Sequence, residues 1–327
     1  MPGKTDLQYD SVIIGAGCAG LAAAMYSGRF LLKTLVIGEL MGGTITLTDV
    51  VENYPGFKSL SGWDLAKNLE GHAKDYPSVD FEEGKAAKVE KCAEHSQGGK
   101  ATCFKVQAGK QEFHGKTVIF ATGTEWKKLG VPGEKELSNR GVHFCALCDG
   151  AFYKEKEVAV IGGSDSAAKD ALVLTQWAKK VYIIYRGEQI HPEPINLKRV
   201  QSNPKIEVIN NANVLEIIAD ASGKKVGKVL LDREVNGSHE FPLNAIFVAI
   251  GHNILSKMAQ EVGVKVNSKQ EIVIDRNART NVPGIFAAGD VVDTEFKQAI
   301  TGAAEGVLAS YSAYEFIQNE SSSGNHR

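Results

Sequence analysis

The chain has 327 residues, of which 43% are hydrophobic and 23% are charged, with a formal net charge of -2. This length exceeds the usual size of one hydrophobic core and favours two folded domains. The near-neutral charge excludes a basic field for nucleic acid, and no apolar run approaches the ~20 residues of a membrane-spanning helix. Because the N-terminus has no apolar signal segment, we expect a cytoplasmic protein that binds neither nucleic acid nor membranes.

Residues 10–39 carry the pattern of a βαβ unit that binds a dinucleotide. Its parts are, in order, a strand over 11–14, the turn Gly15-Ala-Gly17-Cys-Ala-Gly20, a helix over 21–31, a strand over 34–37 and Glu39. The glycines permit a tight turn and a close approach to a pyrophosphate, and the acid is placed to accept from a ribose hydroxyl. Because all parts occur at the required spacing, a turn without a nucleotide is the weaker interpretation.

A second and weaker copy of this pattern covers residues 157–185. Its parts are a strand over 157–161, the turn Gly162-Gly-Ser164-Asp-Ser166-Ala167, a helix through Trp177 and a strand over 181–185. Ser164 replaces the second glycine of the pattern, and no basic cluster follows the last strand. The sequence therefore leaves open whether this unit binds a nucleotide or only retains the fold.

The remaining strand patterns predict how the domains are connected. They are strands over 104–107, 112–114 and 117–120 as a β-meander, a return strand over 245–250, a buried strand before Asp290 and a helix over 298–316. We expect an α/β fold of two Rossmann-like, three-layer ββα nucleotide-binding domains, the second inserted into the first. The first domain would comprise 1–122 and 252–327, and the inserted domain 123–251. We expect the tail 320–327 to be frayed.

Cys145-Ala-Leu-Cys148-Asp149 is the one cysteine pair with motif spacing. Two thiols three residues apart can form a small disulfide that accepts two electrons, so their place between two nucleotide-binding patterns indicates a redox relay. We assign no chemistry to the other three cysteines, which we expect to pack as small apolar or partly exposed groups: Cys18, Cys92 and Cys103. We expect no metal, because no second CxxC or HxxxH lies at ligand spacing.

With these motifs in place, the chain resembles the low-molecular-weight thioredoxin reductases from about Ser11 to the final helix. Further matching motifs follow in the family's order: Gly42-Gly43, Glu52-Asn53-Tyr-Pro-Gly56, Ala121-Thr-Gly123, Ala249-Ile-Gly-His252 and residues 280–290. The resemblance implies an enzyme of redox homeostasis that uses FAD and NADPH. Its partner would be thioredoxin, or a thioredoxin-like or glutaredoxin-like protein, and the resemblance also implies a homodimer.

The resemblance also implies which residues act. For FAD they are Gly15, Gly17, Gly20, Glu39, Gly43, Thr44, Asn53, Thr122, Gly123, Asp290, Gln298 and Ala299, with Thr44 in place of the family's glutamine. For the nicotinamide nucleotide they are Gly162, Ser164, Ser166, Ala167 and Arg186. Cys148 would lie nearer the flavin, Cys145 would attack the partner and Asp149 would carry a proton, with His252 as a weaker candidate. The linkers 122–125 and 251–253 would be hinges for a domain rotation.

The electron donor is the open question. Family members that use NADPH hold its 2′-phosphate with a His-Arg-Arg run and a further arginine, whereas this chain has Tyr185-Arg186-Gly187 and His191 beside Glu188. A phosphate dianion prefers guanidinium partners and is repelled by a carboxylate, so we expect poor selectivity for NADPH. The alternatives are NADH, a ferredoxin or a deazaflavin as donor, or, less favoured, a flavin-bound redox sensor without enzymatic activity.

Overall fold

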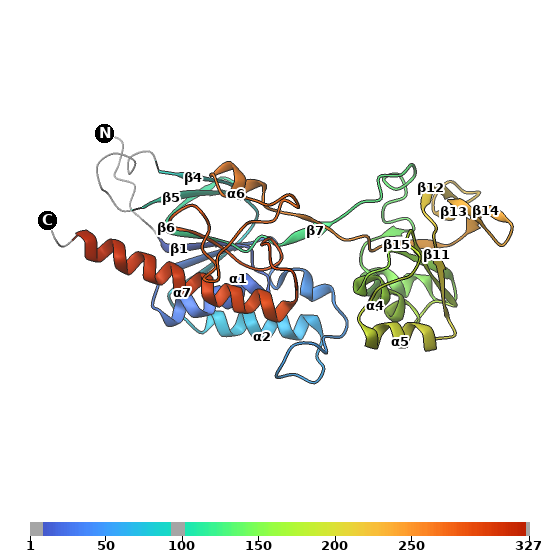
Figure 1. Cartoon of the computed structure of the whole chain (residues 1–327), viewed down its shortest axis with the longest axis horizontal. Coiled ribbons are helices and arrows are strands. Elements are labelled where there is room, and N and C mark those ends of the chain that lie inside the picture. The colour runs from blue at the N-terminus through green and yellow to red at the C-terminus, as the bar shows by residue number, and fades with distance from the viewer. Residues whose placement is uncertain (1–8, 93–101, 325–327) are drawn as a thin grey trace. The chain divides into compact units, whose positions relative to one another are not determined.

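The computed structural model describes residues 9–92 and 102–324 and divides into two compact units (Figure 1). One unit comprises Met1–Thr124 and Ile254–Arg327, and the other comprises Glu125–Asn253. The two linkers between them, β7 (Thr124–Trp126) and β16 (His252–Ile254), pair with each other in a two-stranded sheet. Which cofactor each unit binds stays a prediction.

The first unit is built on a sheet whose central strands are parallel. Neighbouring strands run in the order β3 (Val79–Glu83), β2 (Thr34–Gly38), β1 (Tyr9–Ile14), β6 (Gln111–Phe120), β5 (Phe104–Ala108) and β4 (Ala86–Lys91), and β17 (Ile285–Ala287) also pairs with β6. The pairs β4–β5 and β5–β6 are antiparallel, and β17 is parallel to β6. The carboxyl ends of β1 and β17 therefore lie at the same edge of the sheet, where the chain continues into the glycine turn and into Asp290.

Alternate residues of these strands are buried on opposite faces, as expected of a sheet covered on both sides. Ile13, Val36 and Ile119 pack in a cluster with residues of α1 (Cys18–Arg29) and α7 (Ala299–Gly324). Their neighbours in sequence, such as Val12 and Ile14, pack with residues of β4 and β5. In Figure 1, α7 lies along α1, which agrees with this helical layer. The unit thus has the three layers that were predicted.

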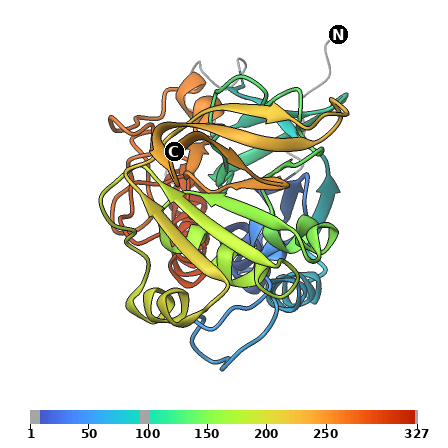
Figure 2. The same cartoon turned by 90° about the vertical axis from the view of Figure 1, so that its right-hand side faces the viewer.

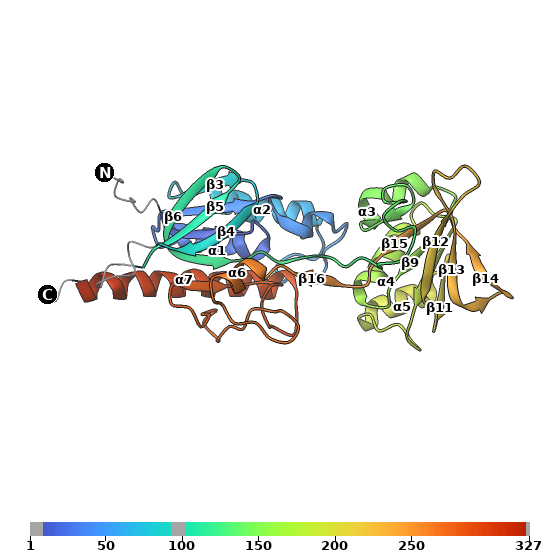
Figure 3. The same ribbon diagram turned by 90° about the horizontal axis from the view of Figure 1, so that it is seen from above.

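The inserted unit repeats this plan with a second parallel sheet. Its strands run in the order β11 (Ile206–Asn210), β10 (Lys180–Tyr185), β9 (Glu157–Ile161), β15 (Ala245–Val248) and β8 (Val142–His143). Val158 and Val160 pack with residues of α4 (Asp165–Leu174), whereas Ala159 and Ile161 pack with the three-stranded sheet of β12 (Val214–Ala219), β13 (Val226–Val235) and β14 (Ser238–Pro242). Figures 2 and 3 show these layers. The predicted fold of two Rossmann-like three-layer units is therefore confirmed.

The other helices connect these layers. They are α2 (Gly62–Lys74), α3 (Ala146–Asp149), α5 (Pro194–Ser202), α6 (Lys257–Glu261) and the 3-10 turns Gly43–Leu47 and Gly150–Tyr153. Across the described ranges, no helix has both the length and the apolar character needed to span a membrane.

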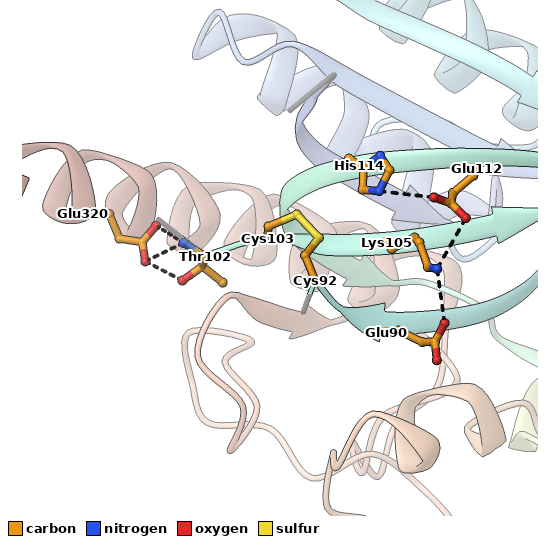
Figure 4. The surroundings of a disulfide bond; sticks show 8 residues. All are labelled: Glu90, Cys92, Thr102, Cys103, Lys105, Glu112, His114 and Glu320. Atoms are coloured by element: carbon orange, nitrogen blue, oxygen red, sulfur yellow. Dashed lines mark hydrogen bonds and ion pairs between the residues drawn. A yellow bond between two sulfur atoms is a disulfide. The ribbon is translucent and has the colours of Figure 1, made fainter. Parts of the chain in front are cut away.

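Four expectations about local structure need correction. The segments 112–114 and 117–120 form one strand, β6, of 10 residues, because its first half pairs with β5 and its second half with β17. The final helix extends to Gly324, beyond the predicted end at 316, and residues 325–327 lie outside the described part. Glu320 is not frayed, since its carboxylate accepts hydrogen bonds from the amide and hydroxyl of Thr102 (Figure 4).

The fourth correction concerns Cys92 and Cys103, which form a disulfide instead of packing as unpaired thiols (Figure 4). The antiparallel register pairs Lys91 with Phe104, so the two cysteines are the next cross-strand pair, with Cα atoms 5.4 Å apart. The Cys92 amide also donates to the Cys103 carbonyl at 3.0 Å. Sequence spacing alone does not reveal a pair created by strand register. Among the described residues, Cys18 is the one free cysteine.

Candidate functional site

The Cys145–Cys148 pair is a disulfide at the start of helix α3. Cys145 is the N-cap of this four-residue helix, its Sγ accepts a hydrogen bond from the Cys148 amide at 3.1 Å, and the Cα atoms are 5.3 Å apart. One helical turn places residues three apart on the same face, which is why this spacing closes a small disulfide. Cys145 is buried, at 9% exposure, whereas Cys148 is exposed.

Asp149 belongs to a polar group that the sequence analysis did not find in full. His143 at the end of β8 is buried, and its Nδ1 lies 3.0 Å from Oδ2 of Asp149. Its Nε2 forms a 2.7 Å hydrogen bond with the hydroxyl of Tyr153. Burial lowers the pKa of His143, although the charge of Asp149 acts in the opposite direction. For Tyr153, burial is the main cause and the charge of Asp149 the second, and together they raise its pKa to about 12. A histidine two residues before the dithiol was the available signal. The weaker candidate His252 lies exposed in the linker strand β16.

The first glycine turn has two positions that the backbone requires and one that it leaves open. Gly15 has φ +112°, and a Cβ there would lie 2.1 Å from the Ala121 carbonyl oxygen, while a Cβ on Gly20 would lie 1.8 Å from the Gly15 oxygen. Gly17 has an ordinary extended conformation, and its Cβ would meet nothing closer than Gly43 Cα at 3.9 Å. The space before the N-terminus of α1 is therefore free, as a pyrophosphate requires.

Two predicted FAD residues from other parts of the chain border this turn. Gly43, with φ +65°, lies beside Gly17, and a bridge joins Gly17 to Gly42. Asp290 follows β17, and its negative charge is near enough to Cys18, at the start of α1, to raise the pKa of that thiol. Burial is the main cause that raises the pKa of Cys18 to about 12, and the Asp290 charge adds to it, so this thiol stays protonated.

The structure also joins Asn53 to Gln298, 245 residues apart in sequence. The Asn53 side-chain amide donates to Oε1 of Gln298 at 2.9 Å, directly before α7 begins at Ala299. Thr122 and Gly123 both form hydrogen bonds with Leu255. The Thr122 hydroxyl donates to the Leu255 carbonyl at 2.8 Å, and the Gly123 carbonyl accepts from the Leu255 amide. Glu39 and Thr44 are exposed.

The second glycine turn has nearly the same backbone as the first. Gly162 has φ +146°, and a Cβ there would lie 2.2 Å from the Ala249 carbonyl oxygen. Ser164 is the N-cap of α4 with φ -84° and ψ -179°, close to the -78° and -172° of Gly17 at the N-cap of α1. The serine thus fits the turn without strain, and its side chain stands at the position that the first turn leaves free.

Residues after β10 fold back onto this second turn. The ring of Tyr185 lies against Gly163 and Gly187, where an added Cβ would come within 2.5 Å and 2.6 Å of ring atoms. The His191 amide donates to the Gly163 carbonyl at 2.8 Å. The carboxylate of Asp165 accepts from the Glu193 amide at 3.0 Å and from the Asn196 side chain at 2.8 Å.

The other predicted nucleotide residues lie around this turn. Ala167 is buried in the first turn of α4, whereas Ser166, Arg186 and Glu188 are exposed. The chain is not helical again until α5, which begins at Pro194. We call residues 187–193 the return loop.

Comparisons with known proteins agree with this architecture. Residues 9–306 match the family described as Pyridine nucleotide-disulphide oxidoreductase. Thioredoxin reductase from Bacillus subtilis (strain 168) is 40% identical over 321 residues, which cover 95% of each chain. The crystal structure of Lactococcus lactis thioredoxin reductase superposes with a TM-score of 0.88 at 34% identity, covering 95% of this chain and 99% of that one. For T. acidophilum thioredoxin reductase the TM-score is 0.87 at 34% identity, with 96% and 100% covered. The chain therefore belongs to the thioredoxin reductases of the pyridine nucleotide-disulphide oxidoreductase family.

Proposed function

We propose that this chain is an FAD-dependent disulfide reductase that passes an electron pair to the disulfide of thioredoxin or of a thioredoxin-like protein. The observation that carries this proposal is the Cys145–Cys148 disulfide with Asp149 directly after it. The family membership agrees with it, since the compared proteins are thioredoxin reductases over nearly the whole length of the chain.

The dithiol would act through two successive exchanges. The Cys145 thiolate attacks one sulfur of the partner disulfide, so a mixed disulfide forms and the other partner sulfur leaves as a thiolate. The Cys148 thiolate then attacks Cys145, which restores the Cys145–Cys148 disulfide and releases the second partner thiolate. Asp149 would take the proton from the attacking thiol and return one to a leaving sulfur. Cys145 is buried in the disulfide state, so this order requires its sulfur to become accessible once the dithiol is reduced.

The residues of the first unit fit FAD. The free space before Gly17, the Asp290 carboxylate and the Asn53–Gln298 pair would hold the pyrophosphate, the ribitol chain and the isoalloxazine, respectively. The N-terminus of α7, a helix of 26 residues, would place its partial positive charge beside the ring system. When bound, FAD would accept an electron pair from the donor and pass it to the disulfide.

We propose that the inserted unit does not select NADPH over NADH. Arg186 is the one arginine present in the sequence Tyr185-Arg186-Gly187-Glu188, and Glu188 beside it is exposed and would repel a phosphate. Ser164 and the ring of Tyr185 narrow the approach to the turn. A donor such as a reduced ferredoxin is the alternative that these features favour if neither nicotinamide reacts.

Anaerobic stopped-flow mixing of the FAD-loaded protein with NADPH, NADH or reduced ferredoxin tests both proposals, with the visible flavin absorbance as readout. We expect both nicotinamides to bleach the flavin at rates within about threefold, because no strong phosphate contact separates them. Flavin reduction about a hundredfold faster with NADPH than with NADH would overturn the proposal that the inserted unit does not select between them. Bleaching by ferredoxin alone would establish the alternative donor.

The reduced protein is then mixed with oxidised thioredoxin, and thioredoxin thiols are counted. We expect them to appear with the wild type and not with Cys148→Ser. The matched control is the double variant Cys92→Ser/Cys103→Ser, which removes the other disulfide and should still reduce thioredoxin. Loss of thioredoxin reduction in this control and retention in Cys148→Ser would contradict the proposed dithiol.

A homodimer and a domain rotation stay predictions from the family. Gly123 and Gly251 have φ of +64° and +101°, and a Cβ at either position would meet no atom within 4 Å. Each predicted hinge segment, 122–125 and 251–253, therefore contains a residue with unusual backbone freedom. Light scattering of the purified protein gives the mass that decides the oligomer. The substitution Gly251→Ala is expected to slow turnover without loss of FAD, because Gly251 is not among the residues expected to bind it.

A further inference from the structure

His143 occupies a buried position between the proposed proton carrier and a tyrosine. Its side chain is 4% exposed, with Nδ1 at 3.0 Å from Asp149 Oδ2 and Nε2 at 2.7 Å from the Tyr153 hydroxyl. We propose that His143 is a positioning residue for disulfide reduction, which holds the Asp149 carboxylate in place beside the dithiol through its Nδ1–H. This inference rests on the role proposed above for Asp149.

The two polar partners of His143 together favour one tautomer of its ring. Burial lowers the pKa of His143, so the imidazole is neutral at neutral pH and has a single N–H. Tyr153 keeps its proton, because burial and Asp149 raise its pKa to about 12. A carboxylate can only accept, so the tautomer that serves Asp149 carries the ring proton on Nδ1, which faces it. Nε2 then accepts from the Tyr153 hydroxyl, which can donate or accept.

The aromatic surroundings hold the ring in this orientation. Phe247 of β15 stacks on His143 with centroids 5.3 Å apart and planes at 26°, and it meets Tyr153 edge-on at 5.9 Å. The titratable groups that contact His143 from the neighbouring elements are Asp149 of α3 and Tyr153 of the following 3-10 turn, whereas β15 presents the apolar Phe247. The ring can therefore act on the carboxylate without a competing charge.

Asp149 needs such support because its own helix is short. The helix α3 has four residues, and the side chain of Asp149 is 29% exposed, so a carboxylate there could otherwise turn toward solvent. In the disulfide state Nδ1 of His143 and Oδ2 of Asp149 are 3.0 Å apart, but their geometry is not that of an aligned hydrogen bond. Nδ1 of His143 has no other hydrogen-bond partner among the described residues. We propose that the carboxylate turns to accept from Nδ1–H when the dithiol is reduced.

Two substitutions separate positioning from packing. Asparagine at 143 places an amide N–H close to the position of Nδ1, whereas glutamine places its amide near Nε2 and leaves no donor toward Asp149. The FAD-loaded protein is reduced with one equivalent of dithionite and mixed with oxidised thioredoxin, and the rate of thioredoxin reduction is measured across acid and neutral pH. We expect His143→Gln to be about tenfold slower, the effect of losing one hydrogen bond to a charged group. His143→Asn should stay within about threefold of the wild type.

The pH profile supplies a readout that packing would not move. In His143→Gln the carboxylate loses a donor that favours its charged form, so the acid limb of the profile should move to higher pH. Tyr153→Phe keeps the ring packing and removes the hydroxyl, so its profile should move in the same direction by less. If His143→Gln does not fold or loses FAD, Tyr153→Phe alone carries the test.

The outcomes separate this inference from the proposed function. Asp149→Asn should be the slowest variant, and a wild-type rate for it would remove the proposed role of Asp149 itself. A slow Asp149→Asn together with a wild-type rate and profile for His143→Gln would overturn the inference alone. Equal impairment of His143→Asn and His143→Gln with an unmoved profile would also overturn it, since the ring would then act through packing.

Discussion

The two glycine turns of this protein share a backbone and differ in the space before it. Gly15 and Gly162 both have positive φ, and in each turn an added Cβ would overlap a carbonyl oxygen of the return strand. At the N-cap of the following helix the backbone dihedral angles of the two turns are nearly equal, but the first turn has Gly17 there and the second has Ser164. The fold thus requires the first glycine of the motif but leaves the second position free, and we propose that the first turn uses this space for its cofactor.

The surroundings of the turns differ in the same sense. The first turn is bordered by Gly43 and by Asp290, and the space that a Cβ on Gly17 would enter is open. The second is covered by the ring of Tyr185 and joined to the return loop through Asp165 and the amide of His191. We therefore expect tight binding of a dinucleotide at the first turn and weak binding at the second.

The largest expected effect is a loss of stability when alanine replaces the first glycine of either turn. Gly15→Ala and Gly162→Ala each add a Cβ at 2.1–2.2 Å from a backbone oxygen in a conformation that L residues rarely adopt. We expect each to cost about 3 kcal/mol or more of unfolding free energy. Urea unfolding followed by circular dichroism measures this, and an unchanged midpoint for either variant would break the equivalence of the two turns.

Serine exchange between the turns should have the next largest effect. Gly17→Ser places the side chain of the second turn into the first without strain, so we expect FAD affinity to fall about tenfold or more while the apoprotein keeps its stability. The reciprocal variant Ser164→Gly should speed flavin reduction by nicotinamide nucleotides about threefold. FAD affinity comes from fluorescence titration. Full FAD affinity in Gly17→Ser would show that the open space is not used by the cofactor.

A smaller effect is expected from restoring phosphate recognition. A Cβ at Gly187 would lie 2.6 Å from the Tyr185 ring, so Gly187→Arg requires Tyr185→His at the same time. One new guanidinium contact should raise the NADPH to NADH rate ratio about tenfold. The matched control Tyr185→His/Gly187→Gln has similar length without the charge and should leave the ratio unchanged. A rise in the control equal to that of the arginine variant would assign the effect to space instead of charge.

The smallest effect is expected at Cys18, the first residue of α1. Burial and the Asp290 charge raise the pKa of this thiol to about 12, so it stays protonated and is a poor nucleophile at neutral pH. Cys18→Ala should change FAD affinity by about twofold or less, and iodoacetamide should leave Cys18 unmodified in the folded protein. Rapid alkylation measured by peptide mass would show that the start of α1 is more accessible than this structure has it.

Much of the fold was predictable because its signals are local. The strands, the turns and the first glycine of each motif follow from periodicity and from positions that tolerate positive φ, and the predicted Rossmann-like units are found. The errors concern long-range pairing. β6 is one strand because two layers share it, and Cys92 meets Cys103 through strand register, which no local pattern encodes.

The candidate site divides in the same way. Cys145, Cys148 and Asp149 were found because their spacing is contiguous in sequence. The part played by His143 was missed, since it depends on Phe247 from a strand about a hundred residues later and on a tyrosine after α3. A lone histidine next to a redox motif becomes interpretable only when its neighbours are known.

The most direct test of the account is to trap the protein on its partner. The FAD-loaded variants Cys148→Ser and Cys145→Ser are each reduced and then mixed with a modified thioredoxin. This thioredoxin lacks its resolving cysteine, and its remaining active-site cysteine is joined by a disulfide to a small thiol that can leave. The products are identified by mass spectrometry of the intact proteins and of their peptides. We expect a covalent complex through Cys145 in Cys148→Ser and none in Cys145→Ser. A complex formed in Cys145→Ser alone, as the greater exposure of Cys148 would favour, would reverse the assigned roles, and a complex in neither variant would contradict electron transfer through this dithiol.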